Sequence, residues 1–359
     1  MKHSATSDEE LLIETLRMVC PGTTLYEGLE SILRAGTGAL IVLGDSEEVL
    51  KLVNGGFRID SDATPAAMYE LAKMDGAMIL SRDGRRILYA NAHLTPDPSI
   101  VTVETGTRHR TAERVAKQTG EIVIAISQRR SVVTLYRGHM RYILQDVGVL
   151  LTKANQALST LEKYKSVLEQ ALINLTALEF EDLATLHDVV SCLQRAQMVG
   201  RVAREIERYI VELGVEGRLV SMQLDELMVG IENVALMIVK DYAQELEPDG
   251  AQGILAKLDG WSSDELLDMN LFVRLLGYGG NNSLDMPVTP RGYRILHKIP
   301  RLPSPIIENM VATFRALPAI LEASIEELDE VEGIGAVRAK AVKEGLRRLR
   351  EQVLLDRHL

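Results

Sequence analysis

Apolar residues at helical spacing open the chain. Residues 11–20 and 25–35 place apolar side chains three and four positions apart, as helices with one buried face do. A further helix is predicted over residues 65–74, because Pro65 suits a first helical turn and Thr64 can cap it. The first part of the chain is therefore expected to contain several amphipathic helices.

Apolar runs of strand length alternate with these helices. Residues 39–44, ALIVLG, are dense in β-branched and apolar side chains, which is typical of a buried strand. Residues 76–81 and 86–91 are predicted strands, and Asp83-Gly84 between them is a hairpin signal. Further strands are expected over residues 121–127, 132–137 and 140–145. Mixed strands and helices predict an α/β domain that ends near residue 146.

A long stretch of heptad-like spacing follows this domain. Apolar residues recur at alternating steps of three and four from about Val149 to Phe180, and only Lys165 interrupts them. At 1.5 Å per residue, this helix would be roughly 48 Å long. The seam consists of Leu151, Ala154, Leu158, Leu161, Leu168, Leu172 and Leu175. Helical patterns then continue without a motif that carries chemistry, so a helical spacer or an oligomerisation spine is expected.

The turn-rich stretch GGNNSLDMP, residues 279–287, separates this spine from a locally basic segment. From Val288 onward there are 12 Lys and Arg against 10 Asp and Glu, whereas the whole chain has a net charge of −11. The sequence therefore predicts three domains, at residues 1–146, 147–287 and 288–359.

Composition limits the class of protein. With 359 residues, 25% of them charged, the chain is long enough for two or three globular domains. Cys20 and Cys192 form no CxxC pair. The N-terminus MKHSATSDEE lacks the apolar core of a signal peptide, and no apolar run is long enough to span a bilayer. We expect a cytoplasmic protein without a membrane partner. The net negative charge argues against a protein whose whole surface binds nucleic acid. A basic module within the chain could still bind nucleic acid.

The first candidate for chemistry is GTRHRT, residues 106–111. Arg108, His109 and Arg110 stand at a predicted helix start, where N–H groups and the helix dipole already favour anions. Thr107 is the predicted cap of this helix. In an acidic chain the cluster indicates a polyphosphate site, although a solvated helix start has a similar composition.

The second candidate is Asp75-Gly76-Ala77, between a predicted helix and a predicted strand. A carboxylate there can hold Mg²⁺, and the glycine lets the backbone approach a ligand, although alone the motif indicates only a turn. No GxxxxGK[ST] motif is present. Gly36 and Gly38 precede a strand, whereas a Rossmann motif follows one, so both are interpreted as turn residues.

Taken together, the two motifs resemble the active site of the diadenylate cyclase domain family, in which DGA and RHR are the signature. NAHLTPDP lies between them and IVIAISQRR follows them. Bacterial members with a C-terminal DNA-binding module resemble the whole chain, through YELAKMDGA, ETGTRHRTAERVAKQTG, LTKANQALSTLEKYK and DEVEGIG. The resemblance implies an N-terminal α/β cyclase domain with a mixed central sheet, a helical spine and a C-terminal helix-hairpin-helix domain. It also implies synthesis of cyclic di-AMP and pyrophosphate from two ATP.

The resemblance further assigns roles to residues. Asp75 is the implied catalytic residue and the ligand of Mg²⁺ or Mn²⁺ near the 3′-hydroxyl and the α-phosphate. Arg108 and Arg110 suit the β- and γ-phosphates, because a guanidinium can bind phosphate with two hydrogen bonds. Leu94 is the implied contact to adenine through its backbone, and Ser127 is a weaker phosphate candidate. The predicted ATP-binding set is Asp75, Gly76, Ala77, Leu94, Thr107, Arg108, His109, Arg110, Thr111 and Ser127.

The C-terminal segment carries another specific motif. Ser324 and Glu327 form a predicted capping box, and a short helix leads to Gly333-Ile334-Gly335, after which Ala336 begins a second helix. This resembles a helix-hairpin-helix, which binds the phosphate backbone through exposed N–H groups rather than reading bases. Residues 299–314 resemble a degenerate first copy. The predicted DNA contacts are Gly333, Ile334, Gly335, Arg338 and Lys340.

One catalytic domain cannot complete a reaction that is symmetric in its two ATP molecules, so two domains are expected to face each other across a two-fold axis. The family implies an octamer, regulation by branched DNA such as recombination junctions, and a nucleoid-associated location. Two other interpretations remain open. One is a scaffold that binds DNA structures and binds nucleotide without catalysis. The other is an ATP-dependent kinase, for which the sequence shows no phosphate loop.

Overall fold

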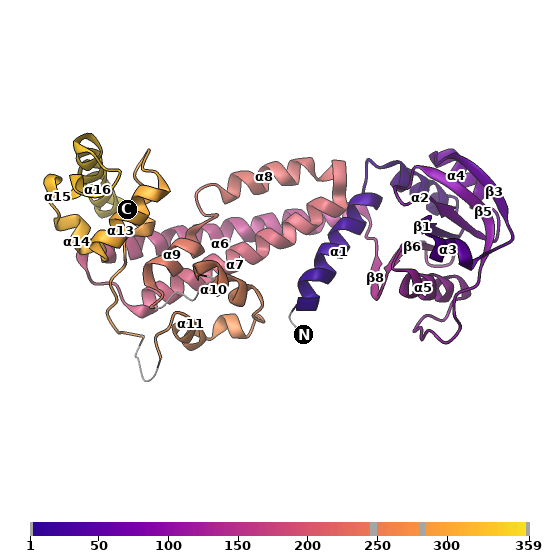
Figure 1. Ribbon diagram of the computed structural model, residues 1–359, viewed down its shortest axis with the longest axis horizontal. Coiled ribbons are helices and arrows are strands. Elements are labelled where there is room, and N and C mark those ends of the chain that lie inside the picture. The colour runs from indigo at the N-terminus through magenta and orange to yellow at the C-terminus, as the bar shows by residue number, and fades with distance from the viewer. Residues whose placement is uncertain (1–2, 245–249, 280–283, 357–359) are drawn as a thin grey trace. The chain divides into compact units, whose positions relative to one another are not determined.

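Figure 1 shows the computed structural model, which describes residues 3–244, 250–279 and 284–356. Within these residues, no helix is both long enough and apolar enough to cross a bilayer.

The chain forms two compact units. The first contains Met1–Gln156 and Ile206–Met222, and the second contains Ala157–Glu205 and Gln223–Leu359. The predicted division into three domains is finer than these two units and remains a prediction.

The first unit is built on one eight-stranded mixed sheet in the order β2-β5-β4-β1-β6-β7-β8, with β3 paired to β5. β1 and β4 are parallel, and the other pairs are antiparallel. The strands are β1 (Ala39–Leu43), β2 (Val53–Asn54), β3 (Phe57–Asp62), β4 (Ala77–Leu80), β5 (Arg86–Leu94), β6 (Ile122–Ser127), β7 (Val132–Arg137) and β8 (Met140–Ile143). The predicted mixed sheet is confirmed, and each predicted strand is present.

Some elements of this unit were not predicted. β3 reads FRIDSD and is mostly exposed, so it lacks the apolar run that marks a buried strand. It pairs with β5 across a register shift between Arg58 and Ser61. β2 has only two residues, and the short helix α3 (Glu47–Leu52) is capped by Ser46. A short or polar edge strand is stabilised by its partner, so its own residues give little signal.

Helices cover both faces of the sheet, as Figure 1 shows. Ile41 and Leu43 of β1 lie in a core with α1, α2 and α4. Leu40 and Val42 of the same strand lie in another core with α3 and α5. The alternation follows from the two-residue period of a strand. The covering helices are α1 (His3–Val19), α2 (Thr24–Arg34), α3, α4 (Pro65–Leu71) and α5 (Thr107–Thr119).

The predicted long helix is α6 (Val147–Glu181), which belongs partly to each unit, as does α7 (Leu186–Leu213). Ala154, Leu158, Leu161, Leu168 and Leu175 of the predicted seam are buried, and Leu151 and Leu172 are half-buried. Lys165 keeps the register of the seam and pairs with Glu169 at 3.7 Å. The helices that follow α7 are η1 (Gly214–Gly217), α8 (Arg218–Met228), α9 (Val234–Tyr242), α10 (Gly250–Asp259), η2 (Glu265–Leu267) and α11 (Met269–Leu275).

The basic C-terminal segment has its own apolar core, into which Phe180 of α6 also packs. Of the predicted turn-rich stretch 279–287, residues 280–283 lie outside the described residues, and Pro287 forms an isolated bridge with Thr185. The helices of this segment are α12 (Tyr293–Leu296), α13 (Ser304–Phe314), α14 (Leu317–Glu322), α15 (Ile325–Asp329) and α16 (Ala336–Asp356).

Candidate active site and DNA-binding hairpin

Segments from four strands meet at one edge of the sheet. β1 and β4 both begin at this edge, whereas β5 and β6 run antiparallel to them and both end there. Gly38 precedes β1, Ala77 begins β4, Leu94 ends β5 and Ser127 ends β6. The spatial order along the edge is therefore Leu94, Ala77, Gly38 and Ser127. Three steps of about 4.8 Å between strands give it a length of roughly 14 Å.

The Arg-His-Arg segment reaches the same edge through α5. Gly120 ends α5 with a φ of +74° and turns the chain into β6, so the first turn of α5 lies where β6 ends. The predicted cap is wrong, because Gly106 occupies the N-cap position and Thr107 is the first helical residue. Gly106 makes no side-chain hydrogen bond, so the first N–H groups of α5 are not occupied by a capping side chain.

Arg108 lies across the beginning of β1. A methyl group on Gly38 would clash with the Arg108 guanidinium and would lie 3.1 Å from the carbonyl oxygen of Ile126. Gly38 was interpreted as a turn residue, but the turn ends at Gly36, and the lack of a side chain at Gly38 leaves room for Arg108. Gly36, with a φ of +65°, is a turn residue as predicted.

His109 packs against the sheet. Its ring meets the Tyr136 ring of β7 edge-on, with ring centroids 6.4 Å apart. Burial lowers the pKa of His109, and the Arg108 cation lowers it further, against the opposing effect of Glu104. The neutral ring is therefore the main form at pH 7. In this arrangement His109 braces the start of α5 against the sheet.

Glu104 anchors the chain just ahead of α5. Its carboxylate accepts hydrogen bonds from the Tyr136 hydroxyl at 2.8 Å and from Arg141 Nε at 2.6 Å. Burial alone would raise the pKa of Glu104, but the hydrogen bonds from Arg141 and Tyr136 outweigh it and lower that pKa. Burial and the Glu104 carboxylate together raise the pKa of Tyr136, which stays protonated as a donor.

The loop between β5 and α5 is held against α5 by side chains of the helix. Arg114 donates to two loop carbonyl oxygens at 2.9 and 3.0 Å, and Lys117 donates to another at 2.9 Å. Arg110 Nη2 donates to the carbonyl oxygen of Thr105 at 3.0 Å, so this predicted phosphate ligand also supports the loop. Of the two predicted threonines, Thr107 is exposed and Thr111 is half-buried.

Asp75-Gly76-Ala77 connects α4 to β4. α4 begins as predicted, since Thr64 Oγ accepts a hydrogen bond from the Ala67 N–H at 3.2 Å. It ends at Leu71, ahead of the predicted end, and a turn carries the chain to the edge of the sheet. The Asp75 side chain is exposed there, whereas Ala77 is already buried as the first residue of β4.

Sequence reasoning missed Asn91, which contacts this motif. Asn91 Oδ1 accepts a hydrogen bond from the Gly76 N–H at 3.1 Å. A side chain on Gly76 would clash with the main chain of Asn91 and Ala92, so the position requires glycine. An asparagine within a predicted strand was the available signal, because Asn is depleted in strands and tolerates the left-handed region.

Leu94 and Ser127 end their strands at the same edge. The Leu94 side chain is buried in the core, and its main chain pairs with Val53 of β2. The predicted loop HLTPD therefore begins only at Thr95, and a ligand at the edge would meet the main chain of Leu94. Ser127 Oγ accepts a hydrogen bond from the Arg130 N–H at 3.3 Å in the turn that follows β6.

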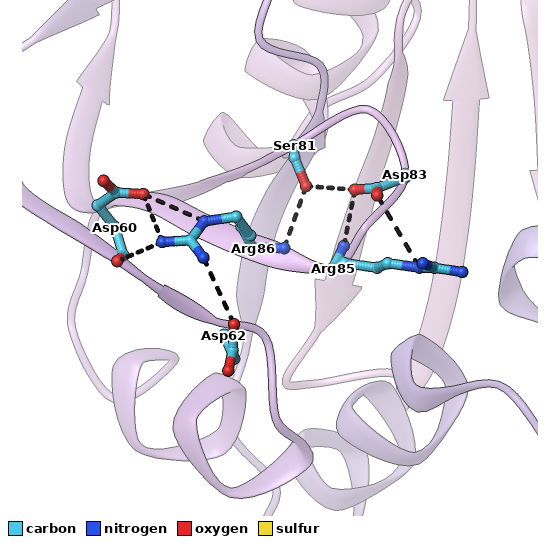
Figure 2. A network of polar contacts seen from close by, with 6 residues as sticks. All are labelled: Asp60, Asp62, Ser81, Asp83, Arg85 and Arg86. Carbon is cyan, nitrogen blue, oxygen red and sulfur yellow. Dashed lines mark hydrogen bonds and ion pairs between the residues drawn. The ribbon is translucent and has the colours of Figure 1, made fainter.

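A different polar cluster occupies the opposite edge, where β4 ends and β5 begins (Figure 2). Arg86 binds one Asp60 carboxylate oxygen through two nitrogen atoms, at 2.9 and 3.2 Å, and Asp62 lies 3.6 Å from its third nitrogen. Ser81 Oγ donates to Asp83 at 2.5 Å within the hairpin turn. A cavity of about 390 Å³ lies beside this turn, and its lining includes Asp62 and Asp83 but none of the predicted site residues. These polar groups bind one another and stabilise the hairpin.

The predicted C-terminal hairpin has the expected local structure. Both hydrogen bonds of the capping box are present, at 3.1 Å from Glu327 N–H to Ser324 Oγ and at 2.7 Å in the reverse direction. Gly333 adopts a φ of +86°, and Ile334 is buried in the core of the segment. Gly335 then leads directly into α16, so the hairpin presents the N-terminus of a long helix.

The two predicted basic DNA contacts differ in their surroundings. Arg338 Nη1 donates to the carbonyl oxygen of Gly333 at 2.8 Å, so this side chain braces the hairpin. Lys340 is exposed and lines a groove of about 950 Å³ together with Lys298, Arg347 and Arg348. The lining also contains Lys343 and one carboxylate, Glu344, which pairs with both arginines, so cations outnumber anions along the groove.

The predicted degenerate first copy, residues 299–314, contains α13 but not a glycine hairpin. Ile299 and Ile306 pack in the same core as Ile334. Arg301 has a φ of +62°, and Pro303 occupies the N-cap position of α13. The connection thus uses a positive-φ arginine and prolines where the second copy uses glycines.

Within residues 3–244, 250–279 and 284–356, no group of three or more His, Cys, Asp and Glu side chains could hold a metal ion. Asp75 nevertheless fits a shared site, because Mg²⁺ is commonly bound by one or two carboxylates together with substrate phosphates. Its carboxylate is exposed at the edge where the phosphate-binding candidates gather.

Comparison with known proteins places these features in context. Residues 26–140 match the family described as DisA bacterial checkpoint controller nucleotide-binding, and residues 144–285 match the DisA bacterial checkpoint controller linker region. The chain is 60% identical to the DNA integrity scanning protein DisA of Carboxydothermus hydrogenoformans, over 96% of this chain and 98% of that protein. It is 59% identical to the DisA of Symbiobacterium thermophilum and 55% identical to that of Clostridium botulinum strain Loch Maree, over 96% and 98% of this chain and 98% of each relative.

Proposed function

The chain belongs to the DisA family of bacterial checkpoint controllers and is a diadenylate cyclase, a nucleotidyltransferase, and from this premise we propose where and how it acts. Cyclic di-AMP forms at the sheet edge that carries Asp75, from two ATP and with release of two pyrophosphates. Branched DNA bound by the C-terminal hairpins regulates this synthesis.

One observation carries the location of the site. The sheet topology gathers Leu94, Asp75-Gly76-Ala77, Gly38 and the start of α5 at one edge, in that order across the strands. An extended ATP can lie across this edge, with adenine beside the main chain of Leu94 and the triphosphate at the start of α5. The 3′-hydroxyl and the α-phosphate would then lie near Asp75, between the two ends.

The start of α5 suits the β- and γ-phosphates. The first N–H groups of a helix bind phosphate, and Gly106 contributes no capping side chain that would compete. Arg108 and Arg110 add guanidinium donors, and Thr107 and Thr111 add hydroxyl groups. His109 holds the helix against Tyr136, which keeps these donors in place. Ser127 is a weaker candidate at the end of β6; its hydroxyl oxygen accepts the Arg130 N–H, and its O–H can still donate to a phosphate.

Diadenylate cyclases use a divalent cation, and Asp75 is the residue we assign to hold it as Mg²⁺ or Mn²⁺. When bound, such an ion neutralises charge on the α-phosphate and lowers the pKa of the attacking hydroxyl. The protein's own contribution is alignment, because in-line attack by the 3′-hydroxyl expels pyrophosphate only when both reacting groups are correctly placed.

Each ATP is both nucleophile and electrophile, so two sites must face each other. A single Arg-His-Arg segment binds one triphosphate, and a two-fold axis supplies the second site. We propose a homo-oligomer, an octamer as the family implies, in which catalytic domains pair face to face. The apolar seam of α6 is already buried within the chain, so further assembly would use other surfaces.

The C-terminal helices are proposed to bind the phosphate backbone of branched DNA, such as recombination junctions. The hairpin at Gly333-Ile334-Gly335 presents the start of α16, and Lys340 lies on the cation-rich groove beside it. Arg338 supports the hairpin and can also face a phosphate. Binding to DNA would give the protein a nucleoid-associated location in the cytoplasm.

The experiment that tests the function is incubation of the pure protein with ATP and Mg²⁺ or Mn²⁺, followed by mass identification of the products. Cyclic di-AMP and pyrophosphate are expected. Unchanged ATP would favour a DNA-binding scaffold without catalysis, and ADP would favour a kinase.

A further inference from the structure

Asn91 combines two unusual features at one point of β5. Its backbone has a φ of +52°, which is uncommon for a residue other than glycine and unusual inside a strand. The pairing of β4 with β5 shifts register between Ala77 and Ile79, opposite the segment that contains Asn91. A strand bulge of this kind redirects a side chain and is found often beside active sites.

The redirected side chain meets the DGA motif. Asn91 Oδ1 accepts the Gly76 N–H at 3.1 Å, and the main chain of Asn91 lies so close to Gly76 that no side chain fits there. The peptide between Asp75 and Gly76 is therefore fixed by a hydrogen bond to the Asn91 side chain and by close packing of Gly76 on the main chain of the same residue. The neighbouring Asp75 carboxylate is exposed.

We propose that Asn91 is a positioning residue for catalysis, which orients the Asp75-Gly76 peptide so that the Asp75 carboxylate faces the reacting groups. This inference rests on the proposed role of Asp75. Asn91 touches neither phosphate nor base in this proposal. It acts through Gly76, by keeping one main-chain orientation in a turn that otherwise has several.

The expected loss falls on turnover rather than on ATP binding. The triphosphate is held by the start of α5, which Asn91 does not touch, so the KM for ATP should change little. A misplacement of about 1 Å at the reacting groups costs roughly a hundredfold in rate, so a partial loss of about tenfold in kcat is expected when the hydrogen bond is removed. The cation concentration for half-maximal rate should rise as well.

Two substitutions of Asn91 separate the effect of its side-chain acceptor from the effect of its backbone conformation. Asn91→Gly keeps the positive φ and removes the acceptor, so kcat should fall about tenfold with a near-normal KM. Asn91→Asp keeps an acceptor and tolerates the left-handed region, so it should retain most of the activity. Wild-type kcat and metal dependence in Asn91→Gly would overturn the proposal. An equal loss in both variants would also overturn it, because the acceptor would then not explain the effect.

Asp60→Gly is the matched control. Asp60 is also a strand residue with positive φ, at +51°, and it also makes a side-chain contact, with Arg86 at the opposite edge of the sheet. This variant should unfold at a lower temperature and keep its kcat, whereas Asn91→Gly should lose kcat. If Asp60→Gly lost kcat as strongly, a general structural effect would explain both and the proposal would fail.

Amide hydrogen exchange of the wild-type protein gives a test that needs no variant. The Gly76 N–H should exchange slowly because Asn91 accepts it, and exchange at the rate of an unstructured amide would contradict the proposal. The Asp75→Asn variant distinguishes a failure of the role of Asn91 from a failure of the proposed function. If Asp75→Asn is inactive while Asn91→Gly behaves as wild type, only the role of Asn91 fails; if Asp75→Asn is fully active, the proposed function of the edge fails.

Discussion

Asp75 places an exposed carboxylate beside a glycine that cannot be replaced, at the edge where the other candidate residues meet. Replacing Asp75 with asparagine keeps its size and removes its charge. We expect cyclisation to fall by at least about a hundredfold, because a charge that stabilises the transition state is lost. ATP affinity should change little, since the proposed phosphate donors of α5 remain. Product formation by mass analysis and equilibrium ATP binding would check this, and near-normal product formation would rule out the metal role.

Gly38 leaves space for the side chain of Arg108. A methyl group there would clash with the Arg108 guanidinium, so Gly38→Ala should displace Arg108 from the start of α5. Hydrogen bonds to a charged group contribute about 1.5–3 kcal/mol, so the KM for ATP should rise about tenfold or more. Gly200→Ala in α7 is the control, because among the described residues nothing lies within 4 Å of the added methyl group. Equal KM values in both variants would show that Gly38 does not support Arg108.

Because the His109 ring is partly buried, we expect the stability of the protein to depend on pH. Its pKa is lowered in the folded protein, mainly by burial, so the unfolded chain takes up the proton more readily. The stabilisation is therefore complete above the ordinary pKa of about 6.5 and is lost as pH falls through the lowered value. His109→Gln removes this titration. Between about pH 7 and about pH 5.5, the Tm of the wild type should fall further than that of His109→Gln. Parallel curves would contradict the buried neutral ring.

Among the secondary-structure elements, the outcome of prediction depended on what stabilises each one. The buried strands β1, β4, β6 and β7 and the seam of α6 were predictable, because their apolar periodicity records their own burial. β3 was not, since a polar strand is stabilised by its pairing with β5.

The residues of the candidate site also differ in how far the sequence predicted them. DGA and RHR were recognisable as motifs, whereas the role of Asn91 depends on a bulge and that of Gly38 on a side chain 70 positions later in the chain. Contacts of that kind leave no local pattern. The Thr107 cap failed for a related reason, because Gly106 is equally allowed at an N-cap and tertiary context decided the start of α5.

A buried polar joint connects three helices of the second unit. Glu179 of α6 pairs with Arg294 of α12 and accepts a hydrogen bond from the Tyr242 hydroxyl of α9 at 2.7 Å. Asp241 of α9 accepts three backbone N–H groups at the start of α12, at 2.6 to 3.0 Å. The joint therefore fixes the first helix of the C-terminal segment to the end of α6.

Breaking this joint should be costly. Glu179→Ala leaves the Arg294 charge buried and unpaired, so the free energy of unfolding should drop by about 3–5 kcal/mol. Glu344→Ala is the matched control, because its pairs with Arg347 and Arg348 are exposed and screened by water, so its loss of stability should be small. Urea unfolding of both variants measures the difference. Similar losses would mean that the joint is not a main source of stability.

For the whole molecule, the question is how DNA, if it binds the C-terminal helices as proposed, could affect the cyclase. α6 is one continuous helix of 35 residues that belongs partly to both units, and the buried joint ties its end to α12. A branched junction can present several backbone segments to several hairpins of one oligomer, which raises the effective concentration of each contact. If engaging them shifts α6, two facing ATP sites would lose their alignment.

We therefore expect branched DNA to lower the cyclase rate. The direction follows from the family resemblance, whereas the physical argument allows either sign. The proposed contacts are to phosphates, so the effect should weaken steeply as salt rises, and Lys340→Ala should reduce the salt slope by about one. The rate is measured against added junction, linear duplex and single strand at one ionic strength. Equal inhibition by all three would refute selectivity for branches. No effect from any of them would mean that DNA binding and catalysis are uncoupled, and Glu179→Ala would then have no coupling to remove. If the junction does inhibit, that variant should bind DNA and show less inhibition, because α12 has lost its ion pair with α6.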